Sequence, residues 1–147
     1  MNTVAQKIAS WEWKYAQQDP AAEAELTQRL IRAASVRDIL RYSDLVSGVT
    51  FRIPTVNDGR EFQIDVHAWT ELDRAILGDF LGSIAATSYA KHSFLLRSIA
   101  VSKLDGAPTA PFFKWAADLG LLQDNSQSGQ LAFWITQTNL TYDHYCV

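Results

Sequence analysis

Cysteine is almost missing from this chain, because Cys146 is the single one among 147 residues. One thiol excludes a framework of intrachain disulfides and a cysteine-based zinc site. A chain of this size without disulfides is typical of a reducing compartment, which predicts a cytoplasmic location. The first residues also lack the charged region and apolar core of a signal peptide. No apolar run approaches the ~18 residues that cross a bilayer, so we expect no membrane partner.

Histidine and net charge are also scarce. The three histidines, His67, His92 and His144, show none of the short spacings that hold a metal ion, and the sequence has no phosphate-binding loop. We therefore predict no metal site and no cofactor. The formal net charge of −3 argues against binding nucleic acid through overall charge, although it leaves a local basic patch open.

Apolar volume, in contrast, is plentiful. Hydrophobic residues make up 48% of the chain, with five Trp, seven Phe and five Tyr, and 20% of the residues are charged. This is the composition of one globular domain with a sizeable core. We predict a single domain over residues 1–147, in which an N-terminal helical pair (1–35) packs on a core formed by 36–147.

Helices are predicted along most of the chain. Val4, Ile8, Trp11 and Tyr15 stand at helical spacing, which predicts an amphipathic helix over the first 18 residues. Asp19-Pro20 then indicates a second helix, with Asp19 as N-cap and proline at the first helical position. Further helices are predicted near 36–46, 69–89 and 112–119, and after the polar loop 124–129. In the long one, the glycines at 78 and 82 predict that another backbone approaches closely.

The strands are predicted from alternation. Residues 49–53 and 61–66 alternate on either side of Asn57-Asp58-Gly59, which predicts a hairpin over 49–66. Pro54 has no N–H to donate, so this strand is expected at an edge. Residues 94–103 alternate as well and predict a third strand. The predicted fold is therefore α+β and mostly helical, with a small antiparallel sheet made of hairpin 49–66 and strand 94–103.

A basic stretch and two tryptophans are the candidate binding residues. Four arginines lie close together in the sequence, and they could form a face for a phosphate backbone or an ordinary solvated face; they are Arg29, Arg32, Arg37 and Arg41. Trp11 and Trp13 point to opposite sides of the predicted first helix. One of them is therefore expected to mark an exposed apolar surface for a partner or a second copy.

One acid–base pair is visible. Asp65 and His67 are two residues apart on a predicted strand, so their side chains share a face, and such a pair can tune a general base. The sequence supplies no nucleophile nearby. A small hydrolase or transferase is therefore the least favoured function.

Part of the chain, about 42–108, resembles a known DNA-repair domain. Tyr42-Ser-Asp-Leu-Val resembles the Tyr-Gly-Glu-Leu-Ala helix of the winged-helix domain in alkylguanine-DNA alkyltransferases and alkyltransferase-like proteins. Arg74-Ala-Ile-Leu-Gly is similar to that family's Arg-Ala-Val-Gly recognition helix, and Lys103-Leu-Asp-Gly to the strand and turn after its active site. The resemblance implies a winged-helix-like scaffold in which Arg74 contacts DNA.

The same resemblance excludes the family's reaction. Ser93-Phe-Leu-Leu stands where the family has Pro-Cys-His-Arg, so no thiolate is present to accept an alkyl group. The segment from Tyr42 also resembles small uncharacterised bacterial proteins. We therefore predict a small non-enzymatic binding protein that contacts nucleic acid or has a regulatory role. The alternative is a protein–protein interaction or self-associating scaffold module, including a homodimer.

Overall fold

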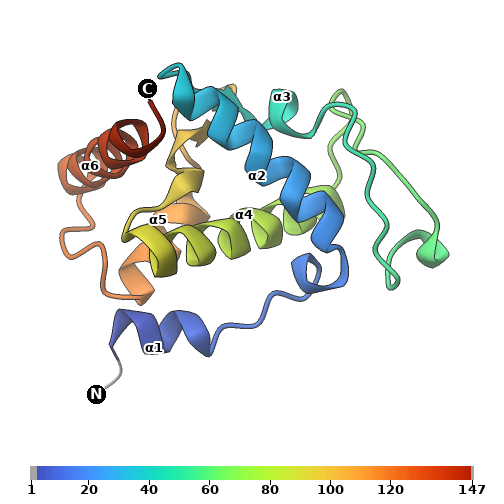
Figure 1. The fold of residues 1–147 in the computed structure, drawn as a ribbon, viewed down its shortest axis with the longest axis horizontal. Helices are drawn as coiled ribbons and strands as arrows, with labels where there is room; N and C mark the ends of the chain where they lie inside the picture. The colour runs from blue at the N-terminus through green and yellow to red at the C-terminus, as the bar shows by residue number, and fades with distance from the viewer. Residues whose placement is uncertain (1–2, 147) are drawn as a thin grey trace.

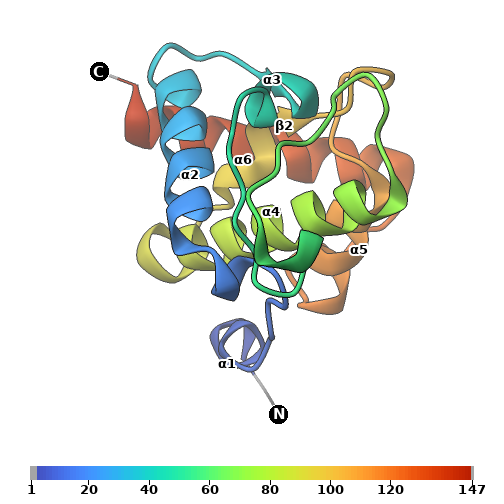
Figure 2. The same cartoon turned by 90° about the vertical axis from the view of Figure 1, so that its right-hand side faces the viewer.

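The computed structural model describes residues 3–146, so the ends of the predicted domain lie outside the described residues. Its long helix α4 (Glu71–His92) runs through the middle of the molecule, and α2 (Pro20–Ser35) crosses it (Figure 1). Helix α6 (Gln127–Tyr145) packs beside α2, and α5 (Ala110–Asp118) lies near α4. In the view turned by 90°, the short helix α1 (Val4–Ala9) lies end-on, below the other helices (Figure 2).

Capping side chains fix where the main helices begin. Asp19 accepts a hydrogen bond from the backbone N–H of Ala22 at 3.1 Å, with Pro20 at the first turn, which confirms the predicted start of α2. At α4, Thr70 and Asp73 form a capping box of two reciprocal 3.0 Å bonds. Local sequence signals therefore determine these boundaries.

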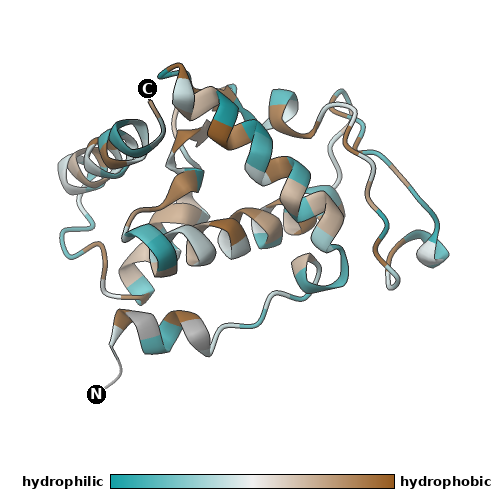
Figure 3. Cartoon of the chain, in the orientation of Figure 1, coloured by the Kyte–Doolittle hydropathy of each residue, from teal (hydrophilic) through white to brown (hydrophobic). Residues whose placement is uncertain are grey.

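The middle of helix α4 is covered on all sides. Every residue from Leu81 to Ala86 is buried, so this turn of the helix faces protein all round. One side contributes Phe80 to the main core, and the other contributes Ala85 to a second cluster with Phe112 of α5. Hydrophobic residues run along much of α4 and along the buried segment 94–101 beneath α2, which we call the central segment (Figure 3). None of the helices described between residues 3 and 146 has both the length and the apolar character to cross a membrane.

The first helix is shorter than predicted. It ends at Ala9, and the chain from Ser10 onward runs extended to a single 3-10 turn, η1 (Ala16–Gln18). The carboxylate of Asp79 on α4 accepts hydrogen bonds from the backbone N–H groups of Tyr15 and Ala16, both at 2.8 Å. These two hydrogen bonds to a distant side chain use N–H groups that a continuing helix would have needed, so the helix does not extend through this segment. We call residues 10–19 the N-terminal strap.

The sheet is parallel, so the predicted antiparallel sheet is wrong. Strand β1 (Leu40–Arg41) pairs with β2 (Ala100–Val101), and the register places Leu40 opposite Ala100. Between them the chain forms α3 (Tyr42–Val46), a long loop and α4. Parallel strands need such a long crossover, whereas a tight turn would have given the antiparallel arrangement.

The predicted hairpin over 49–66 is reduced to one antiparallel bridge, Phe51 with Phe62, and a 3-10 turn, η2 (Asn57–Gly59). The backbone N–H of Arg52 donates to the carboxylate of Asp19 at 2.7 Å, and that of Thr55 donates to the Gln18 side chain at 3.2 Å. Pro54 has no N–H. These donors are therefore either bonded to the end of the N-terminal strap or missing, and no ladder extends from the bridge.

The predicted strand 94–103 is mostly a 3-10 turn, η3 (Leu96–Ile99), followed by β2. All residues from Phe94 to Val101 are buried. The N–H of Leu96 donates to the Ser88 hydroxyl at 3.0 Å, and the N–H of Leu95 donates to the Gln137 side chain at 2.9 Å. Side chains from α4 and α6 thus satisfy backbone groups that a neighbouring strand would otherwise satisfy.

Candidate functional site

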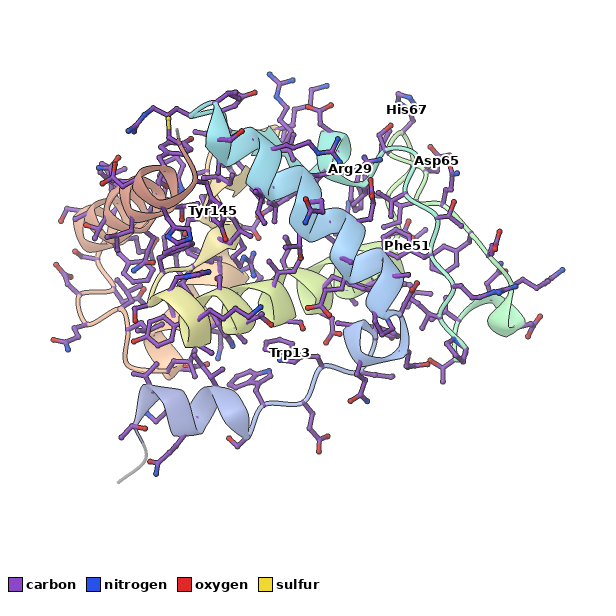
Figure 4. The ribbon with its side chains drawn as sticks, viewed as in Figure 1. Trp13, Arg29, Phe51, Asp65, His67 and Tyr145 are labelled. Atoms are coloured by element: carbon purple, nitrogen blue, oxygen red, sulfur yellow. The ribbon has the colours of Figure 1, made fainter. Side chains whose placement is uncertain are left out.

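The predicted arginine cluster does not form a free basic face. Arg29 donates to backbone carbonyls at the end of α3, most closely to Ser47 at 2.7 Å and Leu45 at 3.2 Å, and it pairs with Glu25 at 3.0 Å. A cation at a helix C-terminus offsets the exposed carbonyl groups there. Arg29 therefore joins α2 to α3, as its position between these helices in Figure 4 shows.

The other three arginines of the cluster are exposed and separated by acids. Arg32 shares a shallow hollow with Arg29, which is also lined by Glu25, Asp38 and Asp44. Arg37 reaches α6, where it pairs with Asp143 at 3.5 Å and lies over the Tyr142 ring. Arg41 is exposed on β1. Neighbouring carboxylates thus reduce the positive potential of this region.

Arg74, the fifth candidate arginine, lies elsewhere. It lines a groove of about 1120 Å³ between the N-terminal strap, the first half of α4, and α5. The loop before α5 and Tyr42 of α3 complete the wall. A single small-molecule site typically measures about 300–1,000 Å³. This groove is therefore slightly larger than a typical site for one small molecule.

Trp11 and Trp13 both belong to this groove. Because α1 ends before them, they do not point to opposite sides of a helix as predicted. Their rings stack with centroids 5.9 Å apart, and both approach Trp115 of α5, at 6.3 and 6.1 Å. Trp11 is 41% exposed, whereas Trp13 is half-buried against α4 (Figure 4). Together with Trp69, they give the groove aromatic walls.

Arg97 is the buried charge of the groove. It lies on η3 at 5% exposure, and its guanidinium is 5.0 Å from the centre of the Phe112 ring. Its Nε has no hydrogen-bond partner among the described residues. Burial lowers the pKa of the Arg97 guanidinium from its ordinary value, while neighbouring Tyr42 acts in the opposite direction. An arginine keeps its charge in proteins, and among the described residues this one is compensated by Tyr42 and by the Phe112 ring, with no carboxylate paired to it.

A second orphan donor lines the same groove. The indole Nε1 of Trp115 is buried and has no hydrogen-bond partner within residues 3–146. The acids on the wall are already engaged: Asp79 binds the strap, and Asp118 pairs with Lys114 at 2.8 Å. The groove thus combines an apolar surface with unpaired donors of positive character.

The candidate general base of the sequence is not assembled. Asp65 accepts a hydrogen bond from the backbone N–H of His67 at 2.9 Å, which closes a local turn. Both side chains point outward from the long loop (Figure 4). The rings of His92 and His144 are tilted, with centroids 4.1 Å apart, and His92 stacks on Phe94, far from His67 along the chain. No three His, Cys, Asp or Glu side chains in the described part of the chain converge as a metal site.

The glycines of α4 shape the groove. A Cβ on Gly82 would overlap the Trp13 indole. This glycine therefore makes room for a side chain, and the prediction that another backbone approaches it is wrong. A Cβ on Gly78 would meet nothing within 4 Å, and Gly78 lines the groove. Gly82 therefore leaves room for the Trp13 side chain, which forms part of the groove wall, and Gly78 leaves the interior of the groove open.

These two glycines form a matched pair for mutation. Gly78→Ala is expected to raise the free energy of unfolding by about 0.5–1 kcal/mol, because alanine is the better helix former and no atom is displaced. Gly82→Ala is expected to lower it by about 1–2 kcal/mol, because the overlap with Trp13 outweighs the same gain. Urea unfolding followed by circular dichroism measures both. Equal stabilisation by the two changes would contradict the packing of Trp13 on Gly82.

Arg97 has only a weak signal in the sequence. One arginine interrupts the largely apolar run Phe94–Val101. Its burial could not be derived from alternation, because both faces of this segment are covered. Trp115 lies within the predicted helix 112–119, but nothing in the sequence marks its N–H as unpaired.

Comparisons with protein-family models, curated proteins and solved structures give no significant match to this chain. The resemblance of residues 42–108 to alkyltransferase-like domains therefore stays a prediction.

Proposed function

We propose that this protein is a non-enzymatic binding protein and that its binding site is the groove between the N-terminal strap, α4 and α5. The observation that carries the proposal is the groove itself, about 1120 Å³ in volume and walled by tryptophans. Concave, mostly apolar surfaces with a few polar groups are the usual sites for ligands. The strap is anchored at Asp79, so this wall exists without a ligand.

A neutral solvatochromic dye tests this proposal. Nile red is expected to bind the wild-type protein, and Gly78→Leu is expected to weaken binding by about tenfold or more, because the new side chain fills the open groove. Ala90→Leu, on an exposed part of the same helix and outside the groove, is the matched control and should bind like wild type. No dye binding by the wild type, or equal binding by Gly78→Leu, would contradict the proposal.

Nucleic acid is the less favoured ligand for this proposed binding protein. Arg29 is occupied by the carbonyls of α3, and Arg37 by Asp143. Arg74 lines the groove instead of extending the cluster. These positions leave few free cations on one face to neutralise a phosphate backbone.

A protein–protein interaction module is the second candidate, and α6 supports it. This helix buries Gln137 and Thr141, which bond to the central segment, and it exposes Leu131 and Ile135 at 52% and 49%. Exposed apolar side chains one helical turn apart suit contact with a partner. Light scattering that reports a monomer at high concentration would argue against self-association through this face.

A further inference from the structure

We propose that the groove selects an amphiphilic carboxylate, whose anionic group binds Arg97 and Trp115 and whose apolar body lies among the tryptophans of the strap. This inference rests on the proposed function, because it names the ligand class of the same site. It requires more than an apolar groove, since it assigns one polar end to the ligand.

The guanidinium of Arg97 carries the first part of the argument. Buried cations in proteins are normally paired with an acid, because desolvation of an unpaired charge is costly. None of the ion pairs among the described residues involves Arg97, and its Nε has no hydrogen-bond partner. The Phe112 ring offers a cation–π contact, but a ring face cannot accept the planar fork of N–H groups as a carboxylate does.

Trp115 supplies an independent donor. Buried indole N–H groups usually find an acceptor. Trp134, for comparison, donates to the backbone carbonyl of Ser98 at 2.7 Å. The Trp115 N–H lacks any such partner, and both orphan donors line one groove. Both nitrogens are covered by protein atoms in the free groove, so a shift of either side chain on binding would offer its N–H to an acceptor group of the ligand.

The charge of the groove favours an anion of low charge. Arg97 is its buried cation, whereas Arg74 and Lys103 are exposed at its edge. Asp79 and Asp118 line the groove as well and are held by the strap and by Lys114. One buried guanidinium matches the single charge and two oxygens of a carboxylate. A phosphate monoester carries up to twice that charge and would also repel these acids.

The apolar body of the ligand has a defined place. Trp11 and Trp13 stack on one side of the groove, and Leu77 and Leu81 of α4 lie along its wall. Gly78 leaves open space between these surfaces. An alkyl or aryl chain bound there would cover Trp11, which is otherwise 41% exposed. The site therefore fits a molecule with one acidic end.

Three ligands with the same ten-carbon chain test the inference by isothermal titration calorimetry. Decanoate is expected to bind the wild type about tenfold or more tightly than decan-1-ol, because a charged hydrogen bond to Arg97 is available only to the acid. Decyl phosphate is expected to bind more weakly than decanoate. In Arg97→Met the preference for decanoate over decan-1-ol should disappear while decan-1-ol still binds.

Two further variants refine the result. Trp115→Phe keeps the aromatic ring and removes the N–H, so decanoate should bind severalfold more weakly and decan-1-ol unchanged. Arg32→Met, the same chemical change on an exposed site of α2 outside the groove, should alter neither affinity. If circular dichroism shows that Arg97→Met does not fold, Arg97→Lys and the wild-type comparison still decide the question.

The outcomes separate this inference from the proposed function. Equal affinity of the wild type for decanoate and decan-1-ol would overturn the carboxylate site and leave the binding groove intact. Tighter binding of decyl phosphate than of decanoate would overturn the choice of carboxylate. Failure of all three ligands, together with failure of Nile red, would overturn the binding function itself.

Discussion

We expect the Phe80→Ala variant to unfold with a free energy about 3–5 kcal/mol below that of the wild type. Phe80 is fully buried where α4 meets the main core, and its ring lies edge-on to Phe51 with centroids 5.5 Å apart. Phe51 stacks in turn on Phe62 at 5.5 Å. Removing the Phe80 ring leaves a cavity and removes its contact with Phe51 of the long loop. Urea unfolding followed by circular dichroism gives the change in free energy.

Phe62→Ala is the matched control for this cavity. Its ring belongs to the same stack but is only half-buried, so we expect a loss of about 1–2 kcal/mol. Phe80→Leu keeps most of the volume and should cost less than about 1.5 kcal/mol. A loss for Phe80→Ala no larger than that for Phe62→Ala would show that the core is not centred on Phe80.

The second large effect is expected for Asp79→Ala, which removes the anchor of the N-terminal strap. Two backbone N–H groups donate to this carboxylate at 2.8 Å, and a buried hydrogen bond to a charged group contributes a net of about 1.5–3 kcal/mol. Because the site is partly exposed, we expect a total loss of about 2–3 kcal/mol. Hydrogen exchange read by mass spectrometry should show faster exchange at Tyr15 and Ala16 than in the wild type.

Asp118→Ala provides the comparison for Asp79→Ala. Asp118 lines the same groove, but its partner is the exposed Lys114, and such surface pairs contribute at most about 1 kcal/mol. We expect unchanged exchange in the strap and a stability within about 0.5 kcal/mol of wild type. Exchange at Tyr15 that is equally slow in the Asp79→Ala variant would mean that the tryptophans alone hold the strap.

Some helix boundaries could be predicted from the sequence, although the end of the first helix could not. Asp19-Pro20 at the start of α2 is a local signal, and so is Gly120, which follows α5 with φ of 85°. Each acts within a few residues and needs no tertiary partner. The tertiary anchor of the strap has no such signal, because Asp79 stands more than sixty residues away from the N–H groups that it binds.

The sheet could not be predicted for a related reason. Alternating residues indicate an extended chain only where backbone groups find a partner strand. In the segment that contains η3, the partners are Ser88 and Gln137, whose side chains come from two different helices. Around Phe51 the competing acceptors are Asp19 and Gln18. Patterns of hydrophobicity carry no information about such side-chain acceptors.

The candidate site was predicted in part. Trp11 and Trp13 were expected to form a partner surface, and they stand on the wall of the groove, although through an extended strap and not a helix. Arg74 also lines it. Whether any ligand or partner binds there stays a prediction. Arg97 was overlooked because its importance comes from burial and from a missing partner, which only the folded chain displays.

The clustering of tryptophans has a spectroscopic consequence. Four of the five line the groove, namely Trp11, Trp13, Trp69 and Trp115. The fifth, Trp134, lies on α6. Replacing this one by phenylalanine would leave an emission spectrum that arises from the groove alone. The chain thus carries its own optical reporter, and the near-ultraviolet fluorescence of the unlabelled protein follows whatever enters or leaves this part of the molecule.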